Sequence, residues 1–407
     1  MKNAFLYLFI LLNSIYGYSQ EKKSLPNGVI VDSVKVANAV KESYAVYLPK
    51  QFNKEMPSAI VFIFDPSGRG KAGIEPFVLA AEIYNYILVC SNNSKNGPTD
   101  INIGIANRLF DAVLGEYNID PSQLYISGFS GGARLAGTIA VSSGAFQGVI
   151  ACGASFTGMD KFVVQGNKFS YVGMVGDTDM NYQEMIQNES WLAKEKIKNT
   201  LFILHQGHTW PSKKEMLRAF DWLEMQAYKK SIRKLNQASI AKIYGENLKI
   251  ADSLKGNNEM ILAIMECQRW NTFFDNQENE KINAAIATIK KSKEYTSQIK
   301  QRDEIAVQEN KITNSILDQF DKELKVAKSE NDFKFWKTEL KKLDDKKIKS
   351  NNSNIKNMVV RLQFMIKALV YETAQECKRN FQNDKLAYCK ELEKVIRSFD
   401  DEKTFNN

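Results

Sequence analysis

The segment LYISGFSGG at residues 124–132 constrains the fold of this chain more than any other feature. An apolar run leads directly into Gly-x-Ser-x-Gly, the pattern in which a strand delivers a nucleophilic serine on a sharp turn before a helix. Such a turn has room only for small residues beside the serine. The flanking residues are Gly128, Gly131 and Gly132. Ser130 is therefore the candidate nucleophile, and the alternative is a glycine-rich turn with an idle serine.

A buried strand followed by acidic residues comes later in the chain. The run FSYVGMV at 169–175 is apolar enough for a strand inside a sheet, and it opens into GDTD, which holds Asp177 and Asp179. A Ser-His-Asp triad needs a carboxylate at such a strand end, to hold the tautomer and orientation of the imidazole. One aspartate is a candidate for this role. The other is a candidate for the cap of a helix that begins near residue 181.

Both histidines of the chain lie in one short loop. The run TLFIL at 200–204 predicts another strand, and HQGHTWP follows it with His205 and His208. His205 ends an apolar strand, where a histidine is more often a hydrogen-bonded structural residue. His208 follows a glycine on a loop that can approach Ser130, which favours His208 as the base that takes the serine proton. The chain order serine, acid, histidine is that of a triad built around a strand-turn-helix nucleophile.

Together, GFSGG, GDTD and GHTWP resemble the α/β-hydrolase serine esterases, especially the secreted carboxylesterase, feruloyl-esterase and polyhydroxybutyrate-depolymerase-like group. The resemblance covers residues 28–228. It implies an α/β-hydrolase fold with a mostly parallel central sheet, and hydrolysis of carboxylic esters through an acyl-enzyme. In that group the acid stands three residues after the glycine that ends its strand, which implies Asp179. The catalytic histidine follows a glycine in a similar GHxWP run, which implies His208.

The oxyanion that forms during acyl transfer needs backbone N–H donors. One is the N–H of the residue after the nucleophile, Gly131, and the other belongs to the loop after the strand AIVFIF at 59–64. The sequence departs from the family pattern in this loop, because the usual HG is replaced by DPSGRG. Pro66 has no N–H, so we expect the second donor to be the backbone of Ser67 or Gly68.

The two halves of the chain differ in composition. After about residue 228 the sequence is rich in Lys, Glu, Asn, Gln, Ile, Leu and Ala at helical spacing and contains no proline. We expect a hydrolase domain at 21–229 and an all-helical domain at 230–407. The expected helices cover 230–254, 257–272, 277–327, 331–345, 354–380 and 383–399, with the third broken internally. The segment at 365–396 resembles a degenerate tetratricopeptide-type helix pair, and a plain helical bundle is the alternative.

Charge separates the halves as well. The formal net charge of +8 lies entirely in residues 229–407, which hold 35 Lys and Arg against 27 Asp and Glu. A mild basic bias of this kind is typical of a solvated surface, and docking of an acidic protein or glycan partner is the functional alternative. The sequence holds no Cys-x-x-Cys, histidine cluster or glycine-rich phosphate loop, so we expect neither a metal nor a cofactor.

The first twenty residues predict export. A lysine, an apolar core of about nine residues and a polar stretch with small residues precede EKKS, as in a secretory signal peptide at 1–20. Its apolar part is too short to cross a bilayer, and we expect no transmembrane segment elsewhere. The mature protein is expected to be soluble and periplasmic or extracellular, without nucleic acid as a partner. An uncleaved N-terminal anchor is the alternative.

An exported serine esterase that acts on a small-molecule or polymer-linked ester is the function that these features favour. Too few residues separate the strands at 146–152 and 169–175 for a helical cap, so the site is expected to be open unless the helical half folds back over it. One alternative is a serine peptidase with the same triad. The other is an idle hydrolase scaffold whose helical half binds or assembles with a partner. We also expect residues 21 to about 230 to fold and act alone.

Overall fold

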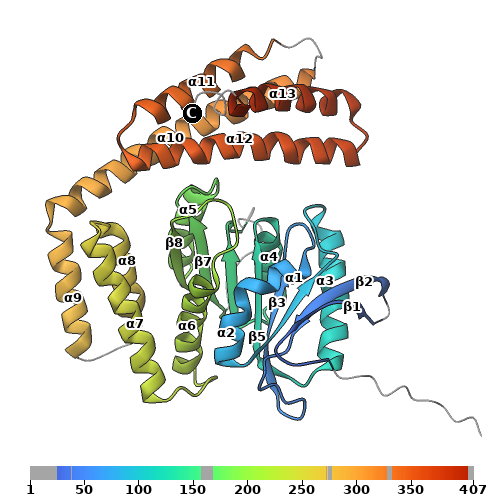
Figure 1. Ribbon diagram of the computed structural model, residues 1–407, viewed down its shortest axis with the longest axis vertical. Coiled ribbons are helices and arrows are strands. Elements are labelled where there is room, and N and C mark those ends of the chain that lie inside the picture. The colour runs from blue at the N-terminus through green and yellow to red at the C-terminus, as the bar shows by residue number, and fades with distance from the viewer. Residues whose placement is uncertain are drawn as a thin grey trace, which may run out of the picture.

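The computed structural model contains an α/β part and a set of long helices that pack against it (Figure 1). It describes residues 25–37, 39–156, 168–271, 273, 277–327 and 332–401. The expected signal peptide at 1–20 lies outside this part of the chain. Within the described residues, no helix is long and apolar enough to cross a membrane.

An eight-stranded sheet forms the centre of the α/β part. Its strands are β1 (Ile30–Val36), β2 (Ala39–Tyr47), β3 (Ser58–Phe64), β4 (Tyr86–Ser91), β5 (Ile119–Phe129), β6 (Gly148–Cys152), β7 (Ser170–Gly176) and β8 (Lys198–Leu204). Their spatial order is β1-β2-β4-β3-β5-β6-β7-β8. Only the pairs β1–β2 and β2–β4 are antiparallel. The expected α/β-hydrolase fold with a mostly parallel sheet is thereby confirmed.

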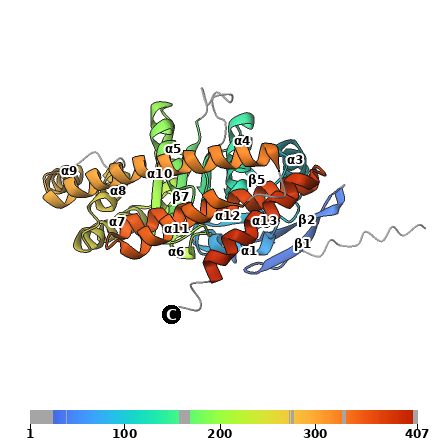
Figure 2. The same ribbon diagram turned by 90° about the horizontal axis from the view of Figure 1, so that it is seen from above.

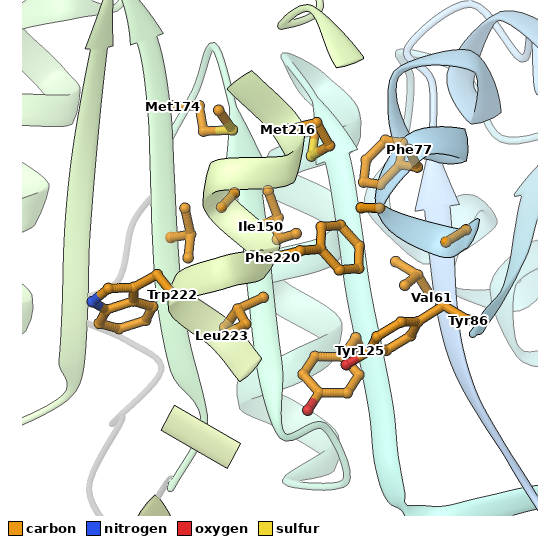
Figure 3. Packing of buried hydrophobic residues seen from close by; sticks show 14 of the residues in the cluster. Val61, Phe77, Tyr86, Tyr125, Ile150, Met174, Met216, Phe220, Trp222 and Leu223 are labelled. Carbon is orange, nitrogen blue, oxygen red and sulfur yellow. The ribbon is translucent and has the colours of Figure 1, made fainter. Parts of the chain in front are cut away.

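Helices cover both faces of the sheet, as the apolar central strands require. They are α1 (Gly70–Ile74), η1 (Glu75–Phe77), α2 (Val78–Tyr84), α3 (Thr99–Glu116), α4 (Gly131–Ser143), α5 (Tyr182–Lys194) and α6 (Lys213–Lys229). α1, α2 and α6 lie on one face, where Phe77, Met216 and Phe220 pack with Val61 and Ile150 of the sheet (Figure 3). α3, α4 and α5 pack on the opposite face. The carboxyl ends of β5, β7 and β8 are left to carry the candidate site.

The second part consists of helices close to the expected positions. They are α7 (Gln237–Gly256), α8 (Met260–Asn271), α9 (Gln277–Lys290), α10 (Lys293–Val326), α11 (Lys334–Lys349), α12 (Ser353–Arg379) and α13 (Asn383–Asp401). The expected break in the third helix is confirmed, because Ser292 caps α10 by accepting a hydrogen bond from the Tyr295 N–H at 3.1 Å. α7 begins later than expected, because Asn236 caps it by accepting from the Ser239 N–H at 2.7 Å.

The helices α10 to α13 enclose a core of their own. Phe320, Trp336, Leu362 and Tyr388 are buried together in it, one from each helix. α12 and α13 form a helix hairpin, as expected for 365–396, while their tetratricopeptide-type character stays a prediction. All five cysteines of the chain are buried free thiols.

The helices α7 and α8 share a core with the sheet. Ile240 of α7 and Trp270 of α8 belong to the same buried cluster as α6. Arg269 of α8 is buried and donates to Thr200 Oγ1 at 2.8 Å and to the Leu201 carbonyl oxygen at 2.7 Å. Both acceptors belong to β8, the edge strand of the sheet. α8 therefore satisfies polar groups that an uncovered edge would leave without protein partners.

A buried carboxylate on α8 reinforces this junction. Glu266 is buried, accepts from Arg218 Nη2 of α6 at 2.6 Å and from Trp270 Nε1 at 2.9 Å, and forms an ion pair with Arg269. Burial alone would raise the pKa of the Glu266 carboxyl, but the charges of Arg269 and Arg218 lower that pKa below its usual value. The carboxylate is therefore kept charged by partners from both parts of the chain.

The helix α12 lies across the carboxyl ends of the parallel strands, and the view from above shows the same arrangement (Figures 1 and 2). Arg361 of α12 donates through Nη1 to the Asp177 carbonyl oxygen, after β7, at 2.6 Å. Its Nε and Nη2 donate to Glu309 of α10 at 2.7 and 2.6 Å. Glu309 also accepts from Gln183 Nε2 of α5 at 2.7 Å. Both charged residues are 4% exposed, and breaking a buried pair of this kind costs about 3–5 kcal/mol.

The contacts of α8 with α6 and the sheet change what we expect of a truncated chain, although the domain boundary near residue 230 itself stays a prediction. A variant that ends at residue 230 lacks Trp270 and leaves Arg218 without Glu266. Loss of a buried tryptophan alone costs about 3–5 kcal/mol, comparable with the whole stability of many domains. We therefore expect this variant to be insoluble or inactive, and a variant that ends at residue 271 to be recovered in higher yield. Soluble yield and melting temperature, measured beside the full-length chain, check this.

An active, soluble fragment that ends at residue 230 would contradict this prediction. It would support instead the independent hydrolase domain that the change in composition favours.

Candidate active site

Strand β5 delivers Ser130 to the start of α4 on a strained turn. Ser130 has φ 52° and ψ −122°, a backbone conformation that few residues other than glycine adopt. A Cβ added to Gly128 would lie 2.2 Å from the Gly132 carbonyl, and one added to Gly132 would lie 2.0 Å from the Phe64 carbonyl oxygen. The Ser130 N–H donates to the Cys152 carbonyl oxygen at 2.8 Å. The turn therefore has the geometry of a nucleophile elbow, held against β6.

His208 and Asp179 meet beyond the ends of β7 and β8. His208 Nδ1 lies 2.9 Å from each of the two carboxylate oxygens of Asp179. Asp179 is 1% exposed, and the His208 side chain is 9% exposed. The Asn181 N–H also donates to Asp179 Oδ1 at 2.9 Å, which fixes the carboxylate from a second side. A carboxylate acceptor at Nδ1 keeps the ring proton there and leaves Nε2 as the proton acceptor.

The His208 ring lies against the nucleophile elbow. Its centroid is 4.6 Å from the ring centroid of Phe129, the residue directly before Ser130. Gly153 follows the strand end that binds the Ser130 N–H, and a Cβ added to Gly153 would lie 3.2 Å from His208 Cε1 and 3.2 Å from Asp179 Oδ2. The structure therefore brings the three residues expected from the sequence to one corner of the sheet.

The helix α12 contributes an aromatic side chain that the sequence motifs did not single out. The Phe364 ring centroid lies 5.6 Å from that of His208, and Phe364 is 39% exposed. The helical half thus folds back over the site. This is the one arrangement in which the sequence does not predict an open site. The sequence signal for Phe364 is its position three residues after Arg361, because this spacing places both side chains on one face of a helix.

The other histidine and aspartate form a second, more exposed pair. His205 Nδ1 lies 2.9 Å from Asp177 Oδ2, and its Nε2 lies 2.8 Å from Glu259 Oε2, just before α8. The His205 side chain is 63% exposed. The hydrogen bond with Asp177 raises the pKa of His205 above its usual value, partial burial opposes this, and the charge of Glu259 adds to the rise. Its position between two carboxylates is that of a structural link.

Replacing His205 by alanine is expected to lower stability in a pH-dependent way while leaving activity nearly unchanged. The pKa of His205 is higher in the folded chain than in the unfolded chain. Its contribution is therefore complete below the unfolded value of about 6.5, and it is lost as the pH rises through the folded value. Melting temperatures of the parent and the variant should differ more near pH 5.5 than at about pH 9. Loss of turnover in a folded His205→Ala protein would move the catalytic base to His205.

The loop after β3 turns the expected oxyanion donors inward. The Ser67 N–H donates to Asp65 Oδ1 at 2.9 Å, and the Gly68 N–H donates to the Asp65 carbonyl oxygen at 3.0 Å. Their assignment as the second donor stays a prediction that requires these bonds to open. Gly131 begins α4, where the orphan N–H groups and the helix dipole favour an anion, and its role as the first donor stays a prediction.

Asp65 organises this loop from a fully buried position. It accepts from Arg69 Nε and Nη2, both at 3.0 Å, and from Trp210 Nε1 at 3.1 Å. Burial alone would raise the pKa of Asp65, but hydrogen bonds from Arg69, Trp210 and Ser67 lower that pKa below its usual value. Arg69 is thus paired within the protein. Trp210, from the GHTWP run, joins the histidine loop to the loop after β3.

A cavity of about 1350 Å³ lies beside this site, between α5, β8, α8, α10 and α12. Asp177, His205 and Arg361 contribute to its lining, whereas Ser130 and His208 do not. Ser130, Asp179 and His208 therefore stand apart from the lining of this cavity.

Comparisons with known proteins find similarity among solved structures only. No family model and no curated protein matches this sequence. Among solved structures, an S-formylglutathione hydrolase from Staphylococcus aureus matches 49% of this chain and 99% of its own, at 14% identity and a TM-score of 0.39. A feruloyl esterase module from Clostridium thermocellum matches 48% of this chain and 87% of its own, at 13% identity and a TM-score of 0.39. About half of this chain is thus outside each match.

Proposed function

We propose that this protein is a serine hydrolase that cleaves carboxylic esters, with Ser130 as nucleophile, His208 as general base and acid, and Asp179 as the residue that orients His208. One observation carries the proposal: the His208–Asp179 pair, with Nδ1 2.9 Å from both carboxylate oxygens, lies against the strained turn that presents Ser130. A serine hydroxyl is a weak nucleophile at neutral pH, and a paired imidazole is the group that activates it.

In the first half of the reaction, Ser130 Oγ attacks the ester carbonyl carbon while His208 Nε2 takes the hydroxyl proton. The carbonyl π electrons move to the oxygen, and the buried carboxylate of Asp179 stabilises the imidazolium that forms. The N–H of Gly131 and the N-terminal dipole of α4 stabilise the oxyanion. When the tetrahedral intermediate collapses, the bond from carbon to the leaving oxygen breaks. His208 gives its proton to the departing alcohol, and the acyl group remains on Ser130.

In the second half, water replaces the alcohol. His208 Nε2 takes a proton from the water as its oxygen adds to the acyl carbon, and a second tetrahedral intermediate forms at the same oxyanion site. The bond to Ser130 Oγ then breaks, and His208 returns the proton to that oxygen. The products are the carboxylic acid, the alcohol and the unchanged enzyme. No metal or cofactor enters this scheme.

The helical half shapes what this site accepts. Phe364 lies beside His208, so α12 supplies an apolar surface next to the reacting ester. A small ester, or one held on a polymer or glycan that approaches past α12, fits this arrangement. The basic bias of residues 229–407 favours an acidic protein or glycan as a partner, and the pattern of residues 1–20 favours export. Binding of an acidic partner and export are both part of what we propose.

One observation favours a second candidate function. Ser67 and Gly68 direct their N–H groups to Asp65 instead of toward Ser130, which is expected of a hydrolase scaffold that has lost catalysis and serves as a binding module. Peptidase activity with the same residues is a third candidate, which differs from esterase activity only in the leaving group.

The full-length protein, incubated with p-nitrophenyl acetate, with a p-nitroanilide peptide and with a fluorophosphonate probe, separates the three. We expect ester turnover and covalent labelling, with little amide cleavage. Faster amide cleavage would make the protein a peptidase. Neither turnover nor labelling would make it an idle scaffold.

A further inference from the structure

The oxyanion formed at Ser130 has one backbone donor in place, and the loop expected to supply another has its N–H groups bonded elsewhere. Those of Ser67 and Gly68 go to Asp65, and that of Gly70 donates to Asn92 Oδ1 at 2.9 Å. Oxyanion sites of acyl-transfer enzymes hold more than one donor, either backbone N–H groups or the side-chain amides of Asn and Gln. A side-chain donor near Gly131 would therefore complete the site.

Asn96 stands at that position. A Cβ added to Gly131 would lie 1.9 Å from Asn96 Oδ1, so the Asn96 amide rests directly against the Gly131 backbone. The Asn96 main-chain N–H donates to the Pro66 carbonyl oxygen at 2.8 Å, which ties its loop to the loop after β3. Asn96 is exposed, and within the described part of the chain its amide has no hydrogen-bond partner.

We propose that the side-chain NH₂ of Asn96 is the second oxyanion donor and acts together with the Gly131 N–H. This inference rests on the proposed esterase function. The amide oxygen faces Gly131 in the resting chain, and a half-turn about the Cβ–Cγ bond exchanges oxygen and nitrogen. A negative charge that develops beside Gly131 attracts the NH₂ group and repels the oxygen. Asn96 therefore binds the transition state more strongly than the neutral ester, which is the condition for lowering the barrier.

Two substitutions test the role of the amide. Asn96→Ala removes the side-chain donor, and Asn96→Asp keeps the shape but offers a negative charge. Loss of one oxyanion donor lowers kcat by about 10²–10³-fold, so we expect losses of that size with little change in KM, and the larger loss in Asn96→Asp. The bond to Pro66 uses the main chain, so the melting temperature should stay close to that of the parent. Lys95→Ala is the control, an exposed neighbour in the same loop, and should keep full turnover.

Inhibition by a trifluoromethyl ketone gives a readout that a structural role would not move. This compound forms a tetrahedral adduct on the serine and places an oxyanion in the site. We expect its affinity to fall in Asn96→Ala by about the same factor as kcat/KM, while the affinity for a product carboxylic acid changes much less.

The outcomes are distinguishable from failure of the proposed function. If the parent protein shows neither turnover nor labelling, the esterase proposal and this inference both fall. If the parent turns over and both Asn96 variants keep kcat within about threefold, Asn96 is not a donor, and a backbone N–H of the loop after β3 fills the role. If Asn96→Ala lowers the melting temperature markedly as well as kcat, the loss of kcat comes from damage to the fold, and this would also overturn the inference.

Discussion

Replacing Ser130 by alanine is expected to abolish covalent labelling by a fluorophosphonate and to lower ester turnover by about a million-fold, to near the background rate. In the proposed mechanism, the elbow, the base and the oxyanion donors act only through the oxygen at this position. Alanine keeps the Cβ of serine, so the strain at φ 52° is no worse and the turn should persist. The measurement combines gel-based labelling with p-nitrophenyl acetate hydrolysis, and an unchanged melting temperature shows that the fold is retained.

Ser142→Ala is a matched control for this variant. Ser142 is an exposed serine on the same helix, α4, far from its N-terminus. It should keep full labelling and turnover. Labelling that persists in Ser130→Ala at the parent rate would place the nucleophile on another residue, and the chemistry proposed for GFSGG would then be wrong.

The elbow was predictable because its information is local. A sharp turn between a strand and a helix excludes side chains, and the clashes that a Cβ would make at Gly128 and Gly132 show why glycines stand there. The strands that carry GDTD and HQGHTWP were predictable for a similar reason, since continuous apolar runs of this length are typical of strands buried on both faces. In a parallel sheet the carboxyl ends lie at one edge, so loops distant in sequence meet there.

Two assignments required a choice between residues close in sequence: Asp177 or Asp179 as the acid, and His205 or His208 as the base. The structure adds which of these side chains pair. His208 lies with Asp179 and His205 lies with Asp177, each at 2.9 Å, so the loops after β7 and β8 form one buried pair and one more exposed pair. Their different burial follows from tertiary packing of Phe129 and Gly153 around His208. Spacing along the sequence carries no information of this kind.

The position of the helical half was beyond the reach of sequence patterns. Helical periodicity predicted the helices and a break somewhere within the third of them, because both follow from local spacing. The structure places that break at Ser292, which caps α10. Helical periodicity did not predict that Arg361 and Glu309 are buried at the loop after β7, since two charged residues on amphipathic helices are usually solvated. Phe364 likewise has the spacing of an ordinary packing residue. What distinguishes these side chains is the surface against which α12 lies.

Replacing Asp179 by asparagine is expected to lower kcat by about ten-thousand-fold, through the wrong tautomer of His208. The contacts of the carboxylate explain why. Asp179 Oδ1 accepts from the Asn181 N–H at 2.9 Å, and this bond will hold the carbonyl oxygen of an introduced amide at the same place. The NH₂ group then occupies the Oδ2 position and faces His208 Nδ1. Nδ1 becomes the acceptor, the ring proton moves to Nε2, and Nε2 no longer takes the proton of Ser130.

Asp177→Asn is the matched comparison, two residues earlier on the same loop. Its side chain bonds to the exposed His205, and the bond from Arg361 reaches its main-chain carbonyl, which the substitution does not alter. We therefore expect kcat to change by only a few-fold in this variant, with some loss of stability at low pH, where His205 is charged. Steady-state kinetics of both variants with p-nitrophenyl acetate decide between the two aspartates. If Asp177→Asn loses turnover and Asp179→Asn keeps it, the acid is Asp177, and the buried pair at His208 is a structural one.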